Sequence, residues 1–245
     1  TEEAGVHSGD SACILPPYDL DANILERVRE QTRALALELG VVGLMNIQYA
    51  VRDKDIFLLE VNPRASRTVP FVSKAIGVPL AKMAARVMAG KSLEELGFTE
   101  DPTPNYSSAK EVVLPFIKFP GVDILLGPEM RSTGEVMGID RTMGLAFAKS
   151  QIAAGNSVPI EDTVFISLND RDKTQMGSLA GDLAGLGFSL MATKGTAALL
   201  REQGLTVEEV YKVGEGRPHI VDRIINGDIH WVINTPLGIT SKTDE

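Results

Sequence analysis

The sequence predicts an α/β protein with two parts: an N-terminal part that contains an antiparallel β-hairpin, and a C-terminal part with a doubly wound parallel sheet. Residues 43–51 and 55–61 are rich in β-branched, aromatic and aliphatic side chains and are separated by the short segment 52–54, which favours a hairpin. From residue 163 onward, strand-like and helix-like segments alternate with short loops between them. Such alternation is typical of a parallel sheet covered by helices on both faces.

The N-terminal part is expected to contain two helices beside the hairpin. Between Leu20 and Leu39, apolar residues recur at helical spacing among many charges, and Gly40 ends the pattern. Pro79 suits the first turn of a second helix, which ends at Ala89. We interpret residues 1–90 as one domain, and the weakly periodic, proline-containing stretch 91–157 as a connecting region.

The C-terminal domain is expected over residues 158–245. Because the chain opens at Thr1 without a methionine or a signal-like segment, we also expect it to be a fragment of a longer protein. The alternating elements of the C-terminal domain are strands at 163–168, 189–193, 210–213 and 229–234, and helices at 173–186, 196–203 and 219–225.

The composition argues against partners such as nucleic acid or a membrane. The 24 basic and 33 acidic side chains give a net charge of −9, which repels a polyphosphate backbone. Apolar runs such as Ile56 to Leu59 are much shorter than the roughly 20 residues of a membrane-spanning helix. Cys13 is the only cysteine, so no intramolecular disulfide can form, and a reducing, cytoplasmic setting is favoured.

Three oxygen-bearing side chains are predicted to gather on one face of the hairpin. Glu60 and Asn62 share a face because side chains alternate along a strand. Gln48 lies opposite Glu60 if the turn is odd in length and centred on Lys54, whereas a two-residue turn at Asp53 and Lys54 would misalign them. In the aligned register the three side chains suit a hard cation such as magnesium or manganese, which takes further ligands from water and phosphate.

Two arginines follow this face closely. The planar guanidinium groups of Arg64 and Arg67 could bind phosphate oxygens bidentately and offset the charge that develops during phosphoryl transfer. The alternative is that Gln48, Glu60 and Asn62 are simply the solvated polar face of an antiparallel hairpin. Spacing alone leaves both interpretations open.

Longer motifs around these residues resemble one enzyme family. The run Leu58-Leu-Glu-Val-Asn-Pro-Arg64 resembles the metal-binding strand of the ATP-grasp superfamily. Its extension to Ala75 resembles the large subunit of carbamoyl-phosphate synthetase, and Thr68-Val-Pro-Phe71 is similar to the second ATP-grasp half, which phosphorylates carbamate. This resemblance implies that residues 1–90 are the C-terminal part of an ATP-grasp domain, an α+β fold with an antiparallel sheet. Further matching runs lie at 5–11, 79–82, 111–116, 127–137 and 215–219.

The resemblance also implies roles for individual residues. Arg64 and Arg67 would be the catalytic residues that face the transferred phosphate. Gln48 and Glu60 would contact both the metal and ATP, and Asn62 would be the third metal ligand. The remaining ATP-site residues would be Gly5, Val6, His7 and Ser8.

Three acidic residues match a further site of the family. Glu2, Asp10 and Glu111 correspond to positions that hold the amine groups of the activator ornithine in some members. The alternative is that they are ordinary surface carboxylates or salt-bridge partners.

A second group of polar residues lies where the predicted parallel strands end. Ligands of open parallel sheets bind there, because the loops lead into helix N-termini that favour anions. Lysine charge and threonine hydroxyls at this edge suit a small phosphate-bearing ligand. The alternative is helix capping by threonine beside solvated lysines. The residues are Lys173, Thr193, Thr196, Lys212 and Asn234.

This region resembles the methylglyoxal-synthase-like regulatory domain of the same synthetase. The resemblance implies that the five residues bind a nucleotide effector such as UMP or IMP. Pro236 departs from the family pattern, since some members have threonine there, and this leaves the identity of the effector open. The chain also ends at Glu245, before the family's last strand and helix, so the domain is expected to be incomplete at its C-terminus.

The family resemblance implies a fragment of the ATP-dependent ligase that makes carbamoyl phosphate from glutamine-derived ammonia, bicarbonate and ATP in arginine and pyrimidine biosynthesis. The implied cofactors are ATP and magnesium or manganese, with potassium as a further candidate. The implied partners are the small glutaminase subunit, the rest of the large subunit, a nucleotide effector and ornithine. The fragment by itself is expected to be inactive, because most of the nucleotide clamp precedes Thr1.

Two alternatives belong to other functional classes. The chain could be an effector-binding module whose N-terminal part is only a folded spacer. It could also be methylglyoxal synthase itself, which is disfavoured because an ATP-grasp-like segment precedes the fold and no acidic residue accompanies Gly195 and Thr196 in their loop.

Overall fold

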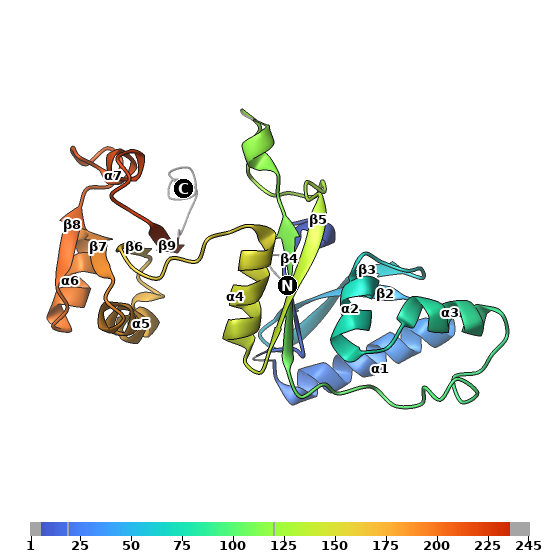
Figure 1. The fold of residues 1–245 in the computed structure, drawn as a ribbon. Coiled ribbons are helices and arrows are strands. Elements are labelled where there is room, and N and C mark those ends of the chain that lie inside the picture. The colour runs from blue at the N-terminus through green and yellow to red at the C-terminus, as the bar shows by residue number, and fades with distance from the viewer. Residues whose placement is uncertain (1–5, 19, 120, 236–245) are drawn as a thin grey trace. The chain divides into compact units, whose positions relative to one another are not determined.

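The computed structural model describes residues 6–18, 20–119 and 121–235, and the chain divides into two compact units, Thr1–Val158 and Pro159–Glu245 (Figure 1). The first unit contains antiparallel strands and helices, and the second contains a parallel sheet with helices. The predicted α/β class, with an antiparallel part followed by a doubly wound part, is therefore confirmed.

One sheet of the first unit has the order β1-β4-β5 and is antiparallel. Its strands are β1 (Cys13–Leu15), β4 (Ser107–Val113) and β5 (Gly134–Asp140), and α4 (Met143–Ala154) packs against β4 and β5 (Figure 1). Two short 3-10 helices flank these strands, η1 (Ser8–Asp10) and η2 (Phe116–Lys118).

Three of these elements, β4, β5 and α4, lie within the stretch 91–157 that the sequence presents as a connecting region. The prolines of this stretch lie outside the strands, so they flank the sheet instead of interrupting it. The weak periodicity arises because both faces of β4 are buried: every residue from Ser108 to Val112 is buried.

The hairpin pairs β2 (Asn46–Arg52) with β3 (Asp55–Asn62), as predicted. Helix α1 (Ala22–Glu38) contacts it: the Arg27 guanidinium donates to the carbonyl of Lys54 at 2.8 Å, and Thr32 Oγ1 lies 3.1 Å from Tyr49 Oη. Helices α1 and α3 (Leu80–Met88) lie within one to two residues of their predicted bounds.

Helix α2 (Thr68–Ile76) was not predicted, because β-branched residues and Pro70 dominate its first half. Pro70 is tolerated because it stands in the first turn, where the backbone N–H that proline lacks has no helical partner. Helix α2 lies beside α3, and Tyr106 Oη donates to the carbonyl of Ala75 at 2.8 Å.

In the second unit all strand pairs are parallel, in the order β8-β7-β6-β9. The strands are β6 (Thr163–Leu168), β7 (Ser189–Thr193), β8 (Val207–Val210) and β9 (Trp231–Thr235). Helices α5 (Lys173–Gly185) and α6 (Lys194–Glu202) bury one face of the sheet with residues such as Leu183 and Leu200. On the other face, Ile220 of α7 (Ile220–Ile225) packs against Phe165, Met191 and Val210.

The strand predicted at 210–213 is wrong in position, since β8 spans Val207–Val210. Its neighbour β7 ends at Thr193, which pairs with Val210, so no ladder is available for the apolar residues that follow. Lys212 therefore lies in the loop beyond the strand. None of the helices in the described ranges is long and apolar enough to cross a lipid bilayer.

Candidate functional site

The hairpin brings together the side chains that the sequence predicts as metal ligands. Gln48 pairs directly with Glu60, and Asn46 pairs with Asn62. Paired residues of an antiparallel ladder point to the same face, and so do residues two apart on one strand. The amide of Asn46 therefore joins the predicted oxygen donors.

This register arises in a different way from the one predicted. The turn consists of Asp53 and Lys54 alone, because Arg52 pairs with Asp55, so the predicted odd-length turn is wrong. A β-bulge compensates: Tyr49 pairs with Leu58 whereas Gln48 pairs with Glu60, which leaves one extra residue, Leu59, in β3. A bulge shifts the register by one residue and realigns the donors that a two-residue turn would have displaced.

The donor set fits a magnesium-type ion. It offers one carboxylate and several amide oxygens, and such a set suits a hard cation that keeps waters and shares phosphate oxygens. Among the described residues there is no group of three or more His, Cys, Asp or Glu side chains that could hold a metal without such help. Asn46 was missed as a candidate, although it stands two residues before Gln48 on the same strand.

Arg64 and Arg67 lie in the loop between β3 and α2, directly after Asn62. The Arg64 backbone N–H donates to the Asn62 carbonyl at 2.8 Å, and its guanidinium donates to the Ala65 carbonyl at 2.9 Å. Arg67 is the N-cap residue of α2, and both side chains are exposed. Both guanidinium groups are thus accessible beside the hairpin face.

The predicted ATP-site residues at the N-terminus include His7, whose structural role is local. His7 Nδ1 accepts a hydrogen bond from the Gly9 N–H at 3.0 Å and caps η1, and the His7 N–H donates to the Gly127 carbonyl at 2.8 Å. Val6 is half-buried and Ser8 is exposed. Gly5 lies outside the described residues.

Two of the three predicted ornithine-site residues are buried. The Asp10 carboxylate accepts from the backbone N–H groups of Arg131 at 2.7 Å and Ser132 at 2.9 Å. Glu111 accepts from the Val112 N–H at 2.9 Å and from the amide of Gln151 on α4. Both carboxylates therefore already have hydrogen-bond donors from the protein, and Glu2 lies outside the described residues.

The second unit has a cavity of about 600 Å³ at the carboxyl ends of its strands. In the sheet, β7 lies on one side of β6 and β9 lies on the other. The strand order therefore reverses at β6, and open parallel sheets bind ligands at such switch points. The cavity brings together all five residues that the sequence places at this edge, namely Lys173, Thr193, Thr196, Lys212 and Asn234.

The start of α6 forms one wall of the cavity. Thr193 is the N-cap residue of α6 but makes no side-chain capping bond, and Gly195 and Thr196 follow in the first turn. Thr196 Oγ1 accepts from the Leu168 N–H at 3.2 Å, so its hydroxyl proton remains available to an acceptor. A helix N-terminus with free donors suits an anion.

The cavity is also lined by apolar side chains. Phe165 and Val232 lie on the strands, and Ile220 and Ile224 lie on α7. A cavity lined by both lysines and hydroxyls and by apolar side chains suits a ligand that joins a phosphate to an organic group.

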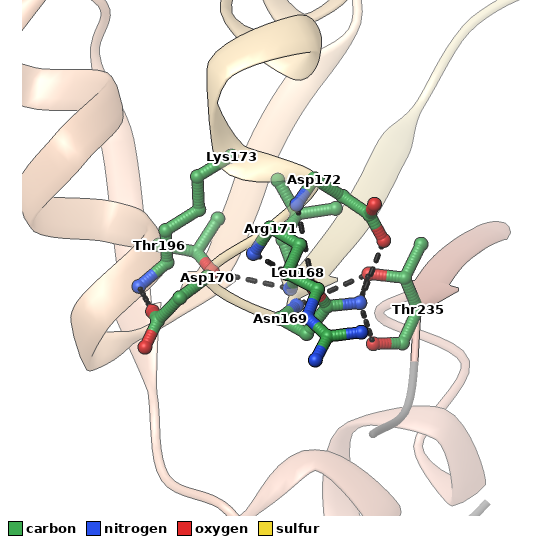
Figure 2. Close-up of polar contacts among 8 residues, drawn as sticks. All are labelled: Leu168, Asn169, Asp170, Arg171, Asp172, Lys173, Thr196 and Thr235. Carbon is green, nitrogen blue, oxygen red and sulfur yellow. Dashed lines mark hydrogen bonds and ion pairs between the residues drawn. The ribbon is translucent and has the colours of Figure 1, made fainter.

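A hydrogen-bond network fixes the loop that follows β6 (Figure 2). The Asn169 amide donates to Asp172 Oδ2 at 2.6 Å and to the Thr235 carbonyl at 3.1 Å, and the Asn169 N–H donates to Thr235 Oγ1 at 3.1 Å. The ends of β6 and β9 are thereby tied together. Asn169 and Asp170 also line the cavity but were not predicted, because an acidic residue is not expected beside a phosphate and an amide in a loop has no distinguishing pattern.

The fold defines a two-part α/β protein, with an antiparallel hairpin that carries oxygen-bearing side chains in one unit and a parallel sheet with a cavity at its strand ends in the other. Residues 2–96 match the family model of the carbamoyl-phosphate synthase L chain, ATP binding domain, and residues 175–245 match the MGS-like domain.

Individual relatives agree with these matches. The chain is 59% identical over 243 residues to the carbamoyl phosphate synthase large chain of Pseudomonas syringae pv. tomato, which covers 99% of this chain and 23% of the relative. It is 58% identical over 244 residues to that of Gemmatimonas aurantiaca, covering 100% of this chain and 22% of the relative. The resemblance to the carbamoyl-phosphate synthetase large subunit is therefore confirmed. The chain spans less than a quarter of the length of these curated relatives.

Proposed function

We propose that this chain is part of an ATP-dependent ligase that makes carbamoyl phosphate from glutamine-derived ammonia, bicarbonate and ATP. The observation that carries the proposal is the register of the hairpin, with Gln48 opposite Glu60 inside a segment that matches an ATP-binding domain. In this proposal residues 1–90 belong to an ATP-grasp domain, residues 91–157 form a connecting region, and residues 158–245 form the regulatory domain.

In the proposed reaction the chain's own side chains bind and orient the reacting phosphate. Gln48, Glu60 and Asn62 hold magnesium or manganese, and the ion supplies positive charge at the ATP phosphates. Arg64 and Arg67 donate to the oxygens of the phosphoryl group as it passes to carbamate. Gly5, Val6, His7 and Ser8 complete the ATP site, and potassium is a further candidate ion.

The second unit is proposed to bind a nucleotide effector such as UMP or IMP. Lys173 and Lys212 supply charge for the phosphate, and Thr193, Thr196 and Asn234 supply hydrogen bonds. Ornithine would bind at Glu2, Asp10 and Glu111, where its amines would have to share the carboxylate oxygens that Arg131, Ser132 and Gln151 already contact. The other proposed partners are the small glutaminase subunit and the rest of the large subunit, in the cytoplasm.

The metal site is tested by Glu60→Gln, which keeps the shape of the side chain and removes the only carboxylate of the donor set. We expect the dissociation constant of Mn²⁺ with ATP to rise by about tenfold or more, as measured by electron paramagnetic resonance of free Mn²⁺. The control is Glu30→Gln on the exposed face of α1, which changes the net charge equally. Equal Mn²⁺ affinity in the chain and in Glu60→Gln would contradict the assignment.

The alternative function is an effector-binding module without catalysis. It is favoured by the enclosure of the entire cavity within the second compact unit. Calorimetric titrations of UMP, IMP and MnATP distinguish the two proposals: binding of a nucleoside monophosphate without binding of MnATP supports the module, and binding of both supports the ligase portion.

A further inference from the structure

We propose that Asp170 is an internal counter-anion of the cavity: its carboxylate forms an ion pair with Lys173 in the absence of ligand, and this pair has to break when a phosphate binds. Asp170 would thereby lower the affinity of the site for anions. This inference rests on the proposed effector-binding function of the second unit.

The contact itself lies inside the cavity wall. Lys173 Nζ lies 2.5 Å from Asp170 Oδ1, and both residues line the cavity (Figure 2). The Lys173 side chain is 24% exposed, whereas that of Asp170 is 93% exposed. The lysine is therefore held in the wall, and the carboxylate approaches it from the solvent side.

The Asp170 carboxylate lies where we expect the anionic group of a ligand to bind. A Cβ atom added at Gly195 would lie 3.5 Å from Lys173 Nζ, so the ammonium lies beside the first turn of α6. That turn also carries Thr196 and the free backbone donors of the helix N-terminus. A phosphate that reaches these donors must share Lys173 with Asp170 or displace it.

Both cavity lysines act on this carboxylate. The hydrogen bond and the charge of Lys173, with a smaller contribution from the charge of Lys212, hold the pKa of Asp170 below its ordinary value. A lowered pKa means that the carboxylate stays ionised at neutral pH, and its pairing is lost only as the pH falls through that lowered value. Asp170 thus competes with ligands throughout the neutral range.

The loop is built so that the carboxylate can move while the backbone stays in place. Asn169 anchors the loop to Asp172 and Thr235, so displacing the Asp170 side chain requires no change in the strand ends. An ion pair with one highly exposed partner is weak and is exchanged at little cost.

The test is Asp170→Asn in the full 245-residue chain, with Asp182→Asn as the control. Asp182 is an exposed residue of α5 that does not line the cavity, so its substitution changes the net charge equally. Isothermal titration with UMP, inorganic phosphate and acetate should show about three- to tenfold tighter binding of UMP and phosphate to Asp170→Asn, since a competing and repelling charge is gone. Acetate, a monoanion, should gain by a smaller factor, because its single charge is repelled less by Asp170.

A second background separates competition for Lys173 from general charge repulsion. In Lys173→Met, the further change Asp170→Asn should give less than half of the gain seen in the unmodified chain, because there is no ammonium left to release. Unchanged or weaker UMP binding in Asp170→Asn, with measurable binding to the unmodified chain, would overturn this inference and leave the effector site standing. If neither UMP nor phosphate binds to any variant or to the unmodified chain, both this inference and the proposed effector site are overturned.

Discussion

Asp10 illustrates how burial gives an acidic side chain a structural role. The residue is 0% exposed, and its two carboxylate oxygens each accept one backbone N–H, from Arg131 and Ser132. Burial by itself raises the pKa of Asp10, but hydrogen bonding by the side chain and backbone of Ser132 and by the backbone of Arg131 outweighs it, so the pKa lies below the ordinary value. Asp10 therefore fastens η1 to the segment that precedes β5, and is not the surface carboxylate that the sequence offered as an alternative.

We expect Asp10→Asn to destabilise the first unit by about 1–3 kcal/mol, because the new amide NH₂ would face a backbone N–H that needs an acceptor. Urea unfolding followed by far-ultraviolet circular dichroism measures this loss. The fluorescence of Trp231, the only tryptophan, reports the second unit and should not shift. The control Asp101→Asn changes an exposed carboxylate and should leave both transitions in place.

The lowered pKa adds a pH dependence with a definite sign. The stabilisation from ionised Asp10 is complete above about pH 4, the ordinary pKa of aspartate, and is lost as the pH falls through the lower folded value. The difference in stability between the unmodified chain and Asp10→Asn should therefore shrink below that pH. A difference that grows on acidification would contradict the assignment.

At the scale of elements, close backbone packing holds α4 on its sheet. A Cβ atom at Gly138 of β5 would lie 2.0 Å from the Ala146 carbonyl oxygen and 2.6 Å from the Ser150 nitrogen. Only a residue without a side chain permits this approach. Lys149 adds an ion pair to Asp140 at 2.7 Å, but such an exposed pair contributes little.

We predict that Gly138→Ala costs about 2 kcal/mol or more, since α4 has to move away from β5 to accommodate the methyl group. Thermal unfolding monitored by circular dichroism gives the change. Gly144→Ala on α4 itself is the matched control, because a Cβ there meets no atom within 4 Å. That control should be neutral or slightly stabilising, since alanine favours helix, and a similar loss in both variants would refute the packing explanation.

At the scale of the whole molecule, the chain consists of two units that differ in how well they bury their apolar residues. The second unit encloses a continuous core around β6, β7, α5 and α6. The first leaves Leu37 82% exposed, and Phe57 and Leu58 of the hairpin are also exposed. We expect the second unit to be the more stable one.

This expectation is tested by expressing residues 159–245 alone. The shorter chain should keep its circular dichroism spectrum and its cooperative unfolding, and it should bind UMP with the affinity of the 245-residue chain, because the described cavity residues all lie within it. Residues 1–158 alone should unfold at lower urea concentration. Loss of cooperative unfolding in residues 159–245 would show that the second unit depends on the first.

The elements with a local pattern could be predicted from the sequence: the helices and all but one strand of the C-terminal part, the hairpin, and α1 and α3. Hydrophobic periodicity and turn residues are readable without neighbours, whereas the strand expected at 210–213 lies at Val207–Val210. The resemblance to the carbamoyl-phosphate synthetase large subunit was also readable from the sequence, through long uninterrupted motifs. The sequence pattern did not give β4, β5 and α4: β4 is buried on both faces and therefore shows no alternation, and α4 buries only Ala146 and Ser150. The register at Gln48 and Glu60 required the three-dimensional structure, because a bulge depends on pairing across strands. The ion pair between Asp170 and Lys173 required it too, because sequence periodicity does not indicate which charged side chains pair.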